Sequence, residues 1–278
     1  MKKFNTQDIY RYDYILSDIY GVIHNGGIFF ADVKKSFVEL KKAGKNICLV
    51  SNAPRLSTAT HERLIKNGLF DANFTLPIVT SGDVFFHDMK KIDSHVKYYF
   101  IGFSDDLSLF NELVNFTQIH NPRDADIVVI SNTFGIERPF DMQILKEIID
   151  SGVTIYAINP DLIVRPGKKT QYCAGAVAKL LEFAGREVIY YGKPYQKTYD
   201  FVEENFKFKR EKTLFIGDSF ETDIVGADIQ NIDSLLVLSG IHDHQIDFSD
   251  DISIEKSVEK LAQKYKTKST FFSNIFSI

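Results

Sequence analysis

YILSDIYGV, residues 14–22, is a short apolar run that reaches a single carboxylate, Asp18, and is followed by Gly21. Apolar and β-branched residues bounded by a turn signal predict a buried strand that ends at Asp18. In an open α/β sheet, ligands bind at the carboxyl ends of the strands, so Asp18 would face the ligand crevice. The alternative is that Asp18 only caps the following turn, as aspartates at strand ends often do. The rest of the chain has to decide between these interpretations.

The composition is that of an ordinary globular protein. The 278 residues suffice for one large or two modest domains, and 44% are hydrophobic. The 33 basic and 37 acidic residues give a net charge of −4, which does not favour a nucleic-acid partner. Cys48 and Cys173 lie in apolar sequence and indicate buried thiols in a reducing compartment. Because the sequence shows no signal peptide and no apolar run long enough to span a membrane, we expect a cytoplasmic location.

Strands and helices alternate along the chain, which is typical of a parallel sheet. After a turn-rich loop at residues 21–27, further strands are predicted at residues 47–50, 98–101, 127–130, 153–158, 188–191, 213–216 and 234–238. Helices are predicted at residues 142–149, 176–183, 196–206 and 254–264, where glycines mark several of the ends. The apolar tail at residues 271–276 is too short to span a membrane. We expect it to pack on the body of the protein or on a partner.

Polar residues stand at the ends of four predicted strands: Asp18, Ser51 with Asn52, Lys193, and Asp218 with Asp223. If these strands share one parallel sheet, the polar side chains meet in one crevice. Carboxylates can hold a hard divalent cation, and a lysine with a hydroxyl can hold an anion beside it. A free carboxylate oxygen can act as a nucleophile, which completes the equipment for phosphoryl transfer. The alternatives are a solvated loop lysine at position 193 and a helix-capping role for the aspartate at position 223.

The ordered set of motifs resembles the haloacid dehalogenase superfamily. The motifs are DIYGV at residues 18–22, SN at 51–52, GKP at 192–194, and GDS with TD at 217–223. The long gap between the second and third motifs resembles the class II arrangement, in which a substrate-covering cap is inserted there. The segment AGA at 174–176, followed by a helix, resembles the NagD and 4-nitrophenylphosphatase-like branch, class IIA.

This resemblance implies an α/β protein with two parts. A Rossmannoid core with a doubly wound parallel sheet would comprise residues 1–91 plus 188–278. An inserted α/β cap of the C2 type would comprise residues 92–187, a plausible size for an independent domain. It also implies roles for the polar residues that follow the strands. Asp18 would be the nucleophile that becomes an aspartyl phosphate, and Lys193 would neutralise both Asp18 and the phosphate. Ser51 and the backbone of Asn52 would hold the phosphate that is transferred.

The resemblance further implies a Mg²⁺ site and a specificity loop. Asp18, Asp218 and the backbone carbonyl of Tyr20 would hold the ion, and Asp223 would support the metal or bind it directly. In the cap, one turn stands where this branch places its substrate-specificity loop: Asn159, Pro160 and Asp161.

Tyr20 departs from the pattern of the superfamily's phosphatases, which carry a second aspartate at this position. That aspartate protonates the leaving group and then activates water. A phenol with a pKa near 10 is a poor substitute, and losing a positioned acid–base group typically costs ~10²–10⁴ in rate. An aromatic residue here resembles an uncharacterised subgroup of class IIA. His24 could partly substitute because imidazole titrates near neutral pH, unless it is a turn residue that faces solvent.

The leading hypothesis is therefore Mg²⁺-dependent hydrolysis of a small phosphorylated metabolite, slowed by Tyr20. One alternative is a 2-haloacid dehalogenase, since tyrosine also occurs at this position in those enzymes and a halide leaves without a proton. Asp218 and the position of the cap argue against it. Another alternative is a catalytically inactive phosphate-binding or regulatory protein.

Two further expectations concern partners and histidines. Relatives often dimerise through the cap, and Tyr98, Tyr99 and Phe103 look exposed, so we expect a homodimer. His242 and His244 alternate as metal ligands can, but no third soft ligand accompanies them, so the sequence favours a solvated loop there.

Overall fold

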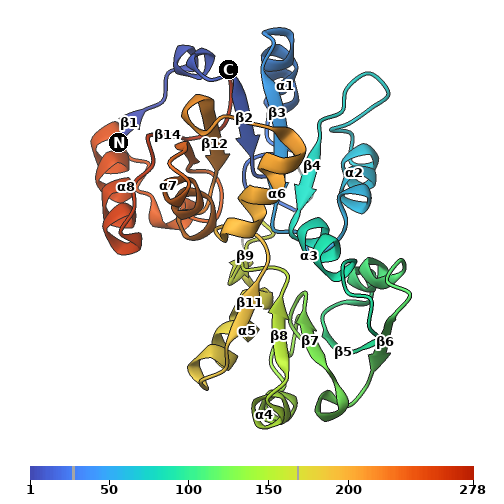
Figure 1. Cartoon of the computed structure of the whole chain (residues 1–278). Helices are drawn as coiled ribbons and strands as arrows, with labels where there is room; N and C mark the ends of the chain where they lie inside the picture. Colours follow the sequence, from blue (N-terminus) through green and yellow to red (C-terminus); the bar gives the residue numbers. More distant parts are fainter. Residues whose placement is uncertain (27–28, 168) are drawn as a thin grey trace.

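The computed structural model describes residues 1–26, 29–167 and 169–278, so Gly27 of the predicted turn-rich loop lies outside the described residues (Figure 1). Within these ranges, seven strands form one sheet in which every neighbouring pair is parallel. In spatial order the strands are β1 (Lys2–Lys3), β14 (Phe271–Ser273), β13 (Asp233–Val237), β12 (Thr213–Gly217), β2 (Tyr14–Ser17), β3 (Asn46–Ser51) and β4 (Ile78–Thr80).

Both faces of this sheet are buried, because side chains alternate between two apolar clusters. In β2, Ile15 belongs to one cluster and Leu16 to the other; Leu214 and Phe215 divide in the same way in β12. This arrangement confirms the predicted doubly wound core. The helices between these strands are α1 (Val33–Lys42), α2 (Ser57–Lys66), α3 (Ser81–Met89), α6 (Gln196–Phe206), α7 (Val225–Ile229) and α8 (Asp251–Tyr265). Short helical segments are η1 (Thr6–Arg11), η4 (Arg210–Lys212), η5 (Phe220–Ile224) and η6 (Asp243–Gln245).

A second parallel sheet lies beyond the carboxyl ends of the first (Figure 1). In spatial order its strands are β11 (Val188–Tyr190), β8 (Thr154–Ala157), β7 (Ile127–Ile130), β5 (Val96–Ile101) and β6 (Phe116–Ile119). Its helical segments are α4 (Met142–Ser151), α5 (Ala174–Phe183), η2 (Ser104–Phe110) and η3 (Pro122–Asp124), and a small antiparallel pair is made by β9 (Ile163–Val164) and β10 (Gln171–Tyr172). We call this second part, which contains the five-stranded sheet, the cap.

Strand β11 corrects the predicted boundary of the cap. The sequence assigns residues 188–191 to the core, but Val188–Tyr190 pairs in parallel with Ile155–Ala157 of β8. The cap sheet therefore includes the strand that leads into Lys193. The period-two apolar pattern of a strand does not say which of two parallel sheets it joins, so sequence alone could not place it. The division into a core and an inserted cap otherwise remains a prediction.

Two other regions refine the expectations. The apolar tail packs on the body of the protein, because Phe271–Ser273 forms β14 and pairs with both β1 and β13. The expectation of an exposed Tyr98 is wrong, since its ring is buried and stacks on Phe110 with the centroids 3.9 Å apart. None of the helices in the described part of the chain combines the length and the apolar character that a membrane span requires.

The tail should contribute measurably to stability. Phe276 is buried in a core cluster, and its ring lies 5.2 Å from that of Phe37 on α1. We expect Phe276→Ala to lower the free energy of unfolding by about 3–5 kcal/mol, because the cavity cannot fully close. The matched control is Phe183→Ala, whose side chain is 88% exposed and should change stability by less than about 0.5 kcal/mol. Urea unfolding of both variants measures the difference, and equal midpoints would contradict this account of the tail.

Candidate active site

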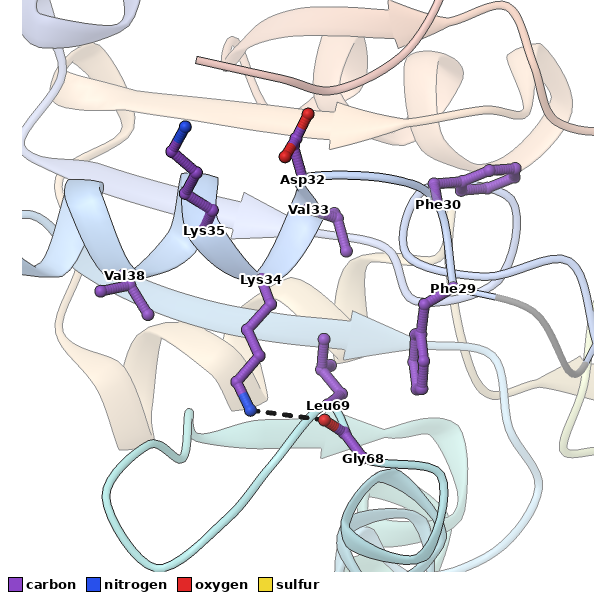
Figure 2. A pocket seen from close by; sticks show the side chains of 9 residues that line it. All are labelled: Phe29, Phe30, Asp32, Val33, Lys34, Lys35, Val38, Gly68 and Leu69. Carbon is purple, nitrogen blue, oxygen red and sulfur yellow. Dashed lines mark hydrogen bonds between the residues drawn. The ribbon is translucent and has the colours of Figure 1, made fainter.

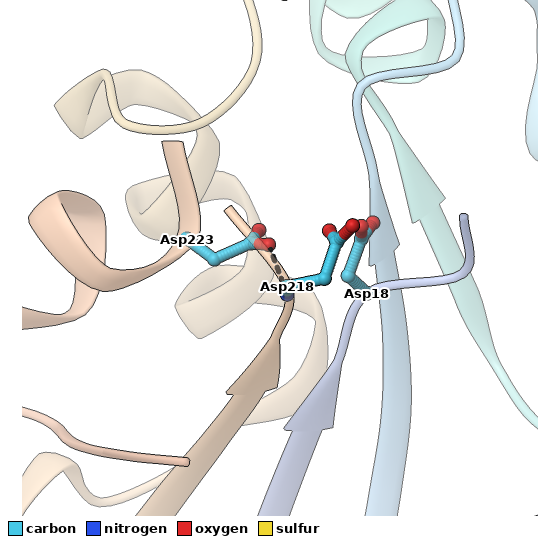
Figure 3. Close-up of side chains that lie close together, drawn as sticks. All are labelled: Asp18, Asp218 and Asp223. Atoms are coloured by element: carbon cyan, nitrogen blue, oxygen red, sulfur yellow. Dashed lines mark hydrogen bonds between the residues drawn. The ribbon is translucent and has the colours of Figure 1, made fainter. Parts of the chain in front are cut away.

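Three carboxylates converge at the carboxyl edge of the larger sheet (Figure 3). Asp18 follows β2 and Asp218 follows the adjacent strand β12, while Asp223 approaches from η5. The register places Ser17 opposite Ile216, and the Asp18 amide continues the pairing by donating to the Ile216 carbonyl at 2.8 Å. One carboxylate oxygen from each aspartate lies within 4.8 Å of the others, and all three residues are buried. The sequence prediction that Asp18 and Asp218 meet is therefore confirmed.

Lys193 lies between two of these carboxylates. Its buried Nζ donates to Oδ1 of Asp18 at 2.7 Å and forms an ion pair of the same length with Oδ1 of Asp223. The expected origin of this lysine is wrong, because β11 belongs to the cap sheet and not to the sheet that carries Asp18. The carboxyl ends of the two sheets meet at the site, which brings the lysine into the predicted position by a different route.

Asn52 holds the backbone of Lys193 in place. Its Oδ1 accepts from the Lys193 amide at 2.7 Å, and its Nδ2 donates to the Lys193 carbonyl at 3.2 Å. The residue before it, Ser51, ends β3 beside β2, and its Oγ accepts from the Ala53 amide at 3.2 Å. The hydroxyl hydrogen of Ser51 remains available to a ligand oxygen. The second predicted motif thus lies at the same edge of the sheet as the acidic cluster.

The orientation of Asp218 depends on a loop that the sequence analysis did not single out. Its Oδ2 accepts from the Ile241 amide at 2.6 Å, after β13 has ended. A Cβ atom on Gly240 would lie 2.0 Å from that oxygen, and one on Gly21 would lie 1.9 Å away. Only glycine allows this close approach at both positions. The available signal was Gly240 itself, which follows the predicted strand at residues 234–238 and shares its sheet edge.

The Asp223 side chain stabilises the turn in which it lies. Its Oδ2 accepts from the amides of Asp218 and Ser219 at 3.0 and 3.1 Å, while its other oxygen faces Lys193. This turn, η5, is a π-helical segment that runs directly into the regular helix α7. Irregular helical turns are frequent at functional sites because they redirect one side chain. Asp223 therefore does more than cap a helix, which was the structural alternative for this residue.

The charge of the cluster favours a cation. Burial raises the pKa of Asp18 to about 7; Lys193 opposes this rise and Asp223 adds to it. Burial also raises the pKa of Asp218 well above its usual range, and the neighbouring carboxylates Asp18 and Asp223 add to the effect. One lysine opposite three aspartates leaves an excess of negative charge that a hard divalent cation would neutralise. Within the described residues, Asp18 and Asp218 each keep one carboxylate oxygen outside these hydrogen bonds, so the donor set fits the predicted Mg²⁺.

Tyr20 and His24 lie side by side near this cluster, with ring centroids 5.4 Å apart. Burial raises the pKa of Tyr20 to about 12, and the charge of Asp218 adds to the rise. Burial lowers the pKa of His24 to about 4, and its Nδ1 accepts from the Gly26 amide at 3.0 Å. His24 is half-buried, so it is not simply a turn residue that faces solvent. Neither ring offers a group that titrates near neutral pH and is free to bind a proton.

His242 also differs from the expectation of a solvated loop. It is buried, and its Nε2 accepts from the Phe220 amide at 3.1 Å, at the start of η5. Its ring lies near those of Phe220 and Tyr265. Because the ring nitrogen accepts a backbone hydrogen bond, His242 supports the turn that carries Asp223. The alternating histidines of the sequence gave no sign of this packing role.

A separate cavity of about 460 Å³ opens beside the start of α1 (Figure 2). It is lined by side chains between Phe29 and Val38 and by Gly68 and Leu69. Lys34 crosses its edge and donates to the Gly68 carbonyl at 3.3 Å. None of the predicted site residues lines this cavity. We therefore assign the candidate site to the acidic cluster, where convergent polar groups provide the chemistry.

Comparison with protein families supports this assignment. A model described as haloacid dehalogenase-like hydrolase matches residues 15–117, and one described as HAD-hydrolase-like matches residues 190–263. The first range contains Asp18, Ser51 and Asn52, and the second contains Lys193, Asp218 and Asp223. Both models describe the same superfamily, so the predicted resemblance to haloacid dehalogenase-like proteins is confirmed.

Individual proteins are similar to this chain over most of its length. A 4-nitrophenylphosphatase of Schizosaccharomyces pombe is 24% identical, and the match covers 92% of this chain and 94% of the relative. A haloacid dehalogenase-like hydrolase of Brucella suis is 25% identical with a TM-score of 0.78, covering 91% of this chain and 96% of the other. A glycerol phosphate phosphatase of Mycobacterium tuberculosis, solved in complex with magnesium, is 20% identical with a TM-score of 0.68, covering 95% and 75%. These likenesses confirm the fold.

The acidic cluster should respond to Mg²⁺ in a pH-dependent way. Mg²⁺ should raise the Tm of the wild type, and more at pH 8 than at pH 6, because protons held by the raised-pKa carboxyls at pH 6 compete with the cation. Asp218→Asn should remove most of this rise without lowering the metal-free Tm, since a buried charge is lost. Asp93→Asn, a change at an exposed carboxylate outside the cluster, is the control. A full Mg²⁺ response in Asp218→Asn would contradict the site.

Proposed function

We propose that this protein is a Mg²⁺-dependent phosphatase that acts on a small phosphorylated metabolite through an aspartyl-phosphate intermediate. The observation that carries the proposal is the buried Lys193 ammonium, held 2.7 Å from carboxylate oxygens of both Asp18 and Asp223. It is one fixed positive charge beside a nucleophilic carboxylate. The similarity to proteins named 4-nitrophenylphosphatase and glycerol phosphate phosphatase supports the same reaction class.

Each residue has a defined task in this proposal. Asp18 attacks the phosphorus with one carboxylate oxygen, and the bond to the leaving oxygen breaks. Lys193 favours the ionised form of Asp18 and offsets the negative charge that accumulates on the transferred phosphoryl oxygens. The Ser51 hydroxyl and the backbone of Asn52 orient those oxygens. Asp18, Asp218 and the Tyr20 carbonyl would hold Mg²⁺ with support from Asp223, and the bound ion would neutralise further charge on the phosphate.

Tyr20 leads us to propose slow turnover and membership of the class IIA subgroup with an aromatic residue in this position. Its phenol, with a pKa raised to about 12, neither protonates a leaving oxygen efficiently nor activates water at neutral pH. Tyr20 also fits two alternative functions, which metal dependence and turnover distinguish. Release of halide from a 2-haloacid without metal would identify a dehalogenase. Binding of phosphate without turnover would identify an inactive regulatory protein.

We assign substrate specificity to a turn of the cap. The turn at Asn159–Asp161 reaches the site from the cap and would contact the part of the substrate beyond the phosphate. We further propose a cytoplasmic protein, consistent with the free, buried thiols of Cys48 and Cys173. The homodimer also remains a proposal, although the burial of Tyr98 removes one of its three supporting aromatics.

The reaction class can be tested with a panel of phosphorylated metabolites and 4-nitrophenyl phosphate, scored for released phosphate. The wild type should release phosphate with Mg²⁺ and lose this activity in EDTA. Asp18→Asn should lower it by at least ~10³ because the nucleophile is gone. Asp93→Asn should match the wild type. Full activity in EDTA, or in Asp18→Asn, would contradict the proposed chemistry.

The leaving group should control the rate. Aryl phosphates leave without a proton, so 4-nitrophenyl phosphate should give a burst of one nitrophenol per site followed by slow turnover. Alkyl phosphates, which need a proton, should react more slowly and show no burst. Rapid quenching at millisecond to second times measures both. Equal single-turnover rates for aryl and alkyl esters would show that Tyr20 imposes no limitation.

A further inference from the structure

One carboxylate of the cap stands beside the acidic cluster without being part of it. Asp161 Oδ1 accepts from Nδ2 of Asn52 at 2.9 Å, and Asn52 in turn holds the backbone of Lys193. Among the described residues, the other carboxylate oxygen of Asp161 forms no hydrogen bond. Asp161 is neither fully buried nor exposed, and its charge acts on Asp18 as well as on Lys193. It therefore presents a free oxygen from the cap side of the site.

The turn that carries Asp161 is held on several sides. Asn159 Oδ1 accepts from the Asp161 amide at 3.0 Å, and the Asp161 carbonyl accepts from the Gly175 amide at 3.1 Å. A Cβ on Gly175 would lie 2.2 Å from the Pro160 carbonyl oxygen, and one on Gly192 would lie 2.6 Å from the Pro160 ring. Such close packing fixes the backbone on both flanks. The carboxylate is thus placed by a rigid support, as a group that acts in catalysis needs to be.

An in-line displacement at phosphorus places the leaving oxygen opposite the attacking oxygen of Asp18. Asp18 rises from the core sheet, so the leaving oxygen points toward the cap. Tyr20 and His24 offer no suitable proton there, as described above. We propose that Asp161 is the acid–base residue of this site: it protonates the leaving oxygen and then activates the hydrolytic water. This inference rests on the proposed phosphatase function and assigns a catalytic residue within it.

The two steps balance with the phosphate ester and water as the only reactants. In the first, an Asp18 oxygen bonds to phosphorus, the bond from phosphorus to the ester oxygen breaks, and that oxygen takes the proton of Asp161. In the second, the Asp161 carboxylate takes a proton from water as the water oxygen bonds to phosphorus, and the bond between phosphorus and Asp18 breaks. Inorganic phosphate leaves, and both aspartates return to their initial states.

The electrostatics of the turn suit both steps. Burial raises the pKa of Asp161 to about 6; Lys193 and Asn52 oppose this rise, and Asp223 and Glu221 add to it. Near this pKa, both protonation states are populated in the neutral range. Asp161 would thereby restore part of the rate that a phenol at position 20 removes.

Asp161→Asn tests the assignment, because asparagine retains an oxygen acceptor for Asn52 and removes the acid. With Mg²⁺ present, single-turnover cleavage of an alkyl phosphate should fall by ~10²–10⁴. The nitrophenol burst from 4-nitrophenyl phosphate should fall far less, and the steady-state rate after it should fall strongly. The matched control is Glu137→Gln, which removes an exposed cap carboxylate and should match the wild type on both esters. Unchanged Tm and far-UV circular dichroism exclude misfolding as the cause.

A rescue experiment separates catalysis from a structural role. Adding Tyr20→Asp to Asp161→Asn should raise the rate of alkyl phosphate cleavage by ~10–10³-fold over that of Asp161→Asn alone. The reason is that a carboxyl then stands where the superfamily's phosphatases have one. If Asp161→Asn lowers aryl and alkyl cleavage equally, lowers neither, or is not rescued, the assignment of Asp161 is overturned while the phosphatase proposal stands. If the wild type releases no phosphate from any ester, the proposed function itself fails, and this inference with it.

Discussion

The contact of Lys193 with Asp18 and Asp223 is the interaction on which the rest of the site depends. Three buried carboxylates within 4.8 Å of one another repel, and burial alone already penalises each charge. A single ammonium, inserted 2.7 Å from two of them, lowers that cost without removing the excess negative charge. The protein thereby retains a site in which the carboxylates still repel one another, and a bound hard divalent cation would reduce that repulsion.

The arrangement of the sheets explains how such a cluster can form. Asp18 and Asp218 follow neighbouring parallel strands. The register of β2 and β12 therefore fixes the separation of their backbones, whatever rotamers the two side chains adopt. Gly21 and Gly240 leave the space that Asp218 occupies, and the Ile241 amide fixes its direction. One carboxylate oxygen of Asp223 accepts hydrogen bonds from two backbone amides of its own turn. The backbone therefore sets most of the geometry, and the side chains complete it.

The sequence predicted much of this, for physical reasons that also mark its limits. Strand ends such as Asp18 and Asp218 were accessible because apolar runs and turn signals are local, and parallel strands present their carboxyl ends together. Lys193 was identified correctly as a site residue but assigned to the wrong sheet, since β11 reads like any other buried strand. Tyr98 and His242 were expected to be exposed but are buried, because the burial of a single polar or aromatic side chain depends on distant segments. Ile241 could not be predicted from the sequence, because the group that it contributes to the site is a backbone amide, which every residue type except proline has.

The pairing of β11 with β8 has a consequence for how this chain could be recombined with others. The cap sheet does not end with helix α5; it includes one more strand, β11, and the residues that follow β11 bring the Lys193 ammonium to Asp18. A cap exchanged at residue 187 would leave an unpaired strand edge on the transplanted sheet and a lysine tethered to the wrong neighbour. A cap exchange that preserves the site would have to include Lys193. It would also have to keep Asn52 of the core, which hydrogen-bonds the Lys193 backbone. Cap and core are thus linked at the site itself, because Lys193 follows a strand of the cap sheet and pairs with two aspartates of the core.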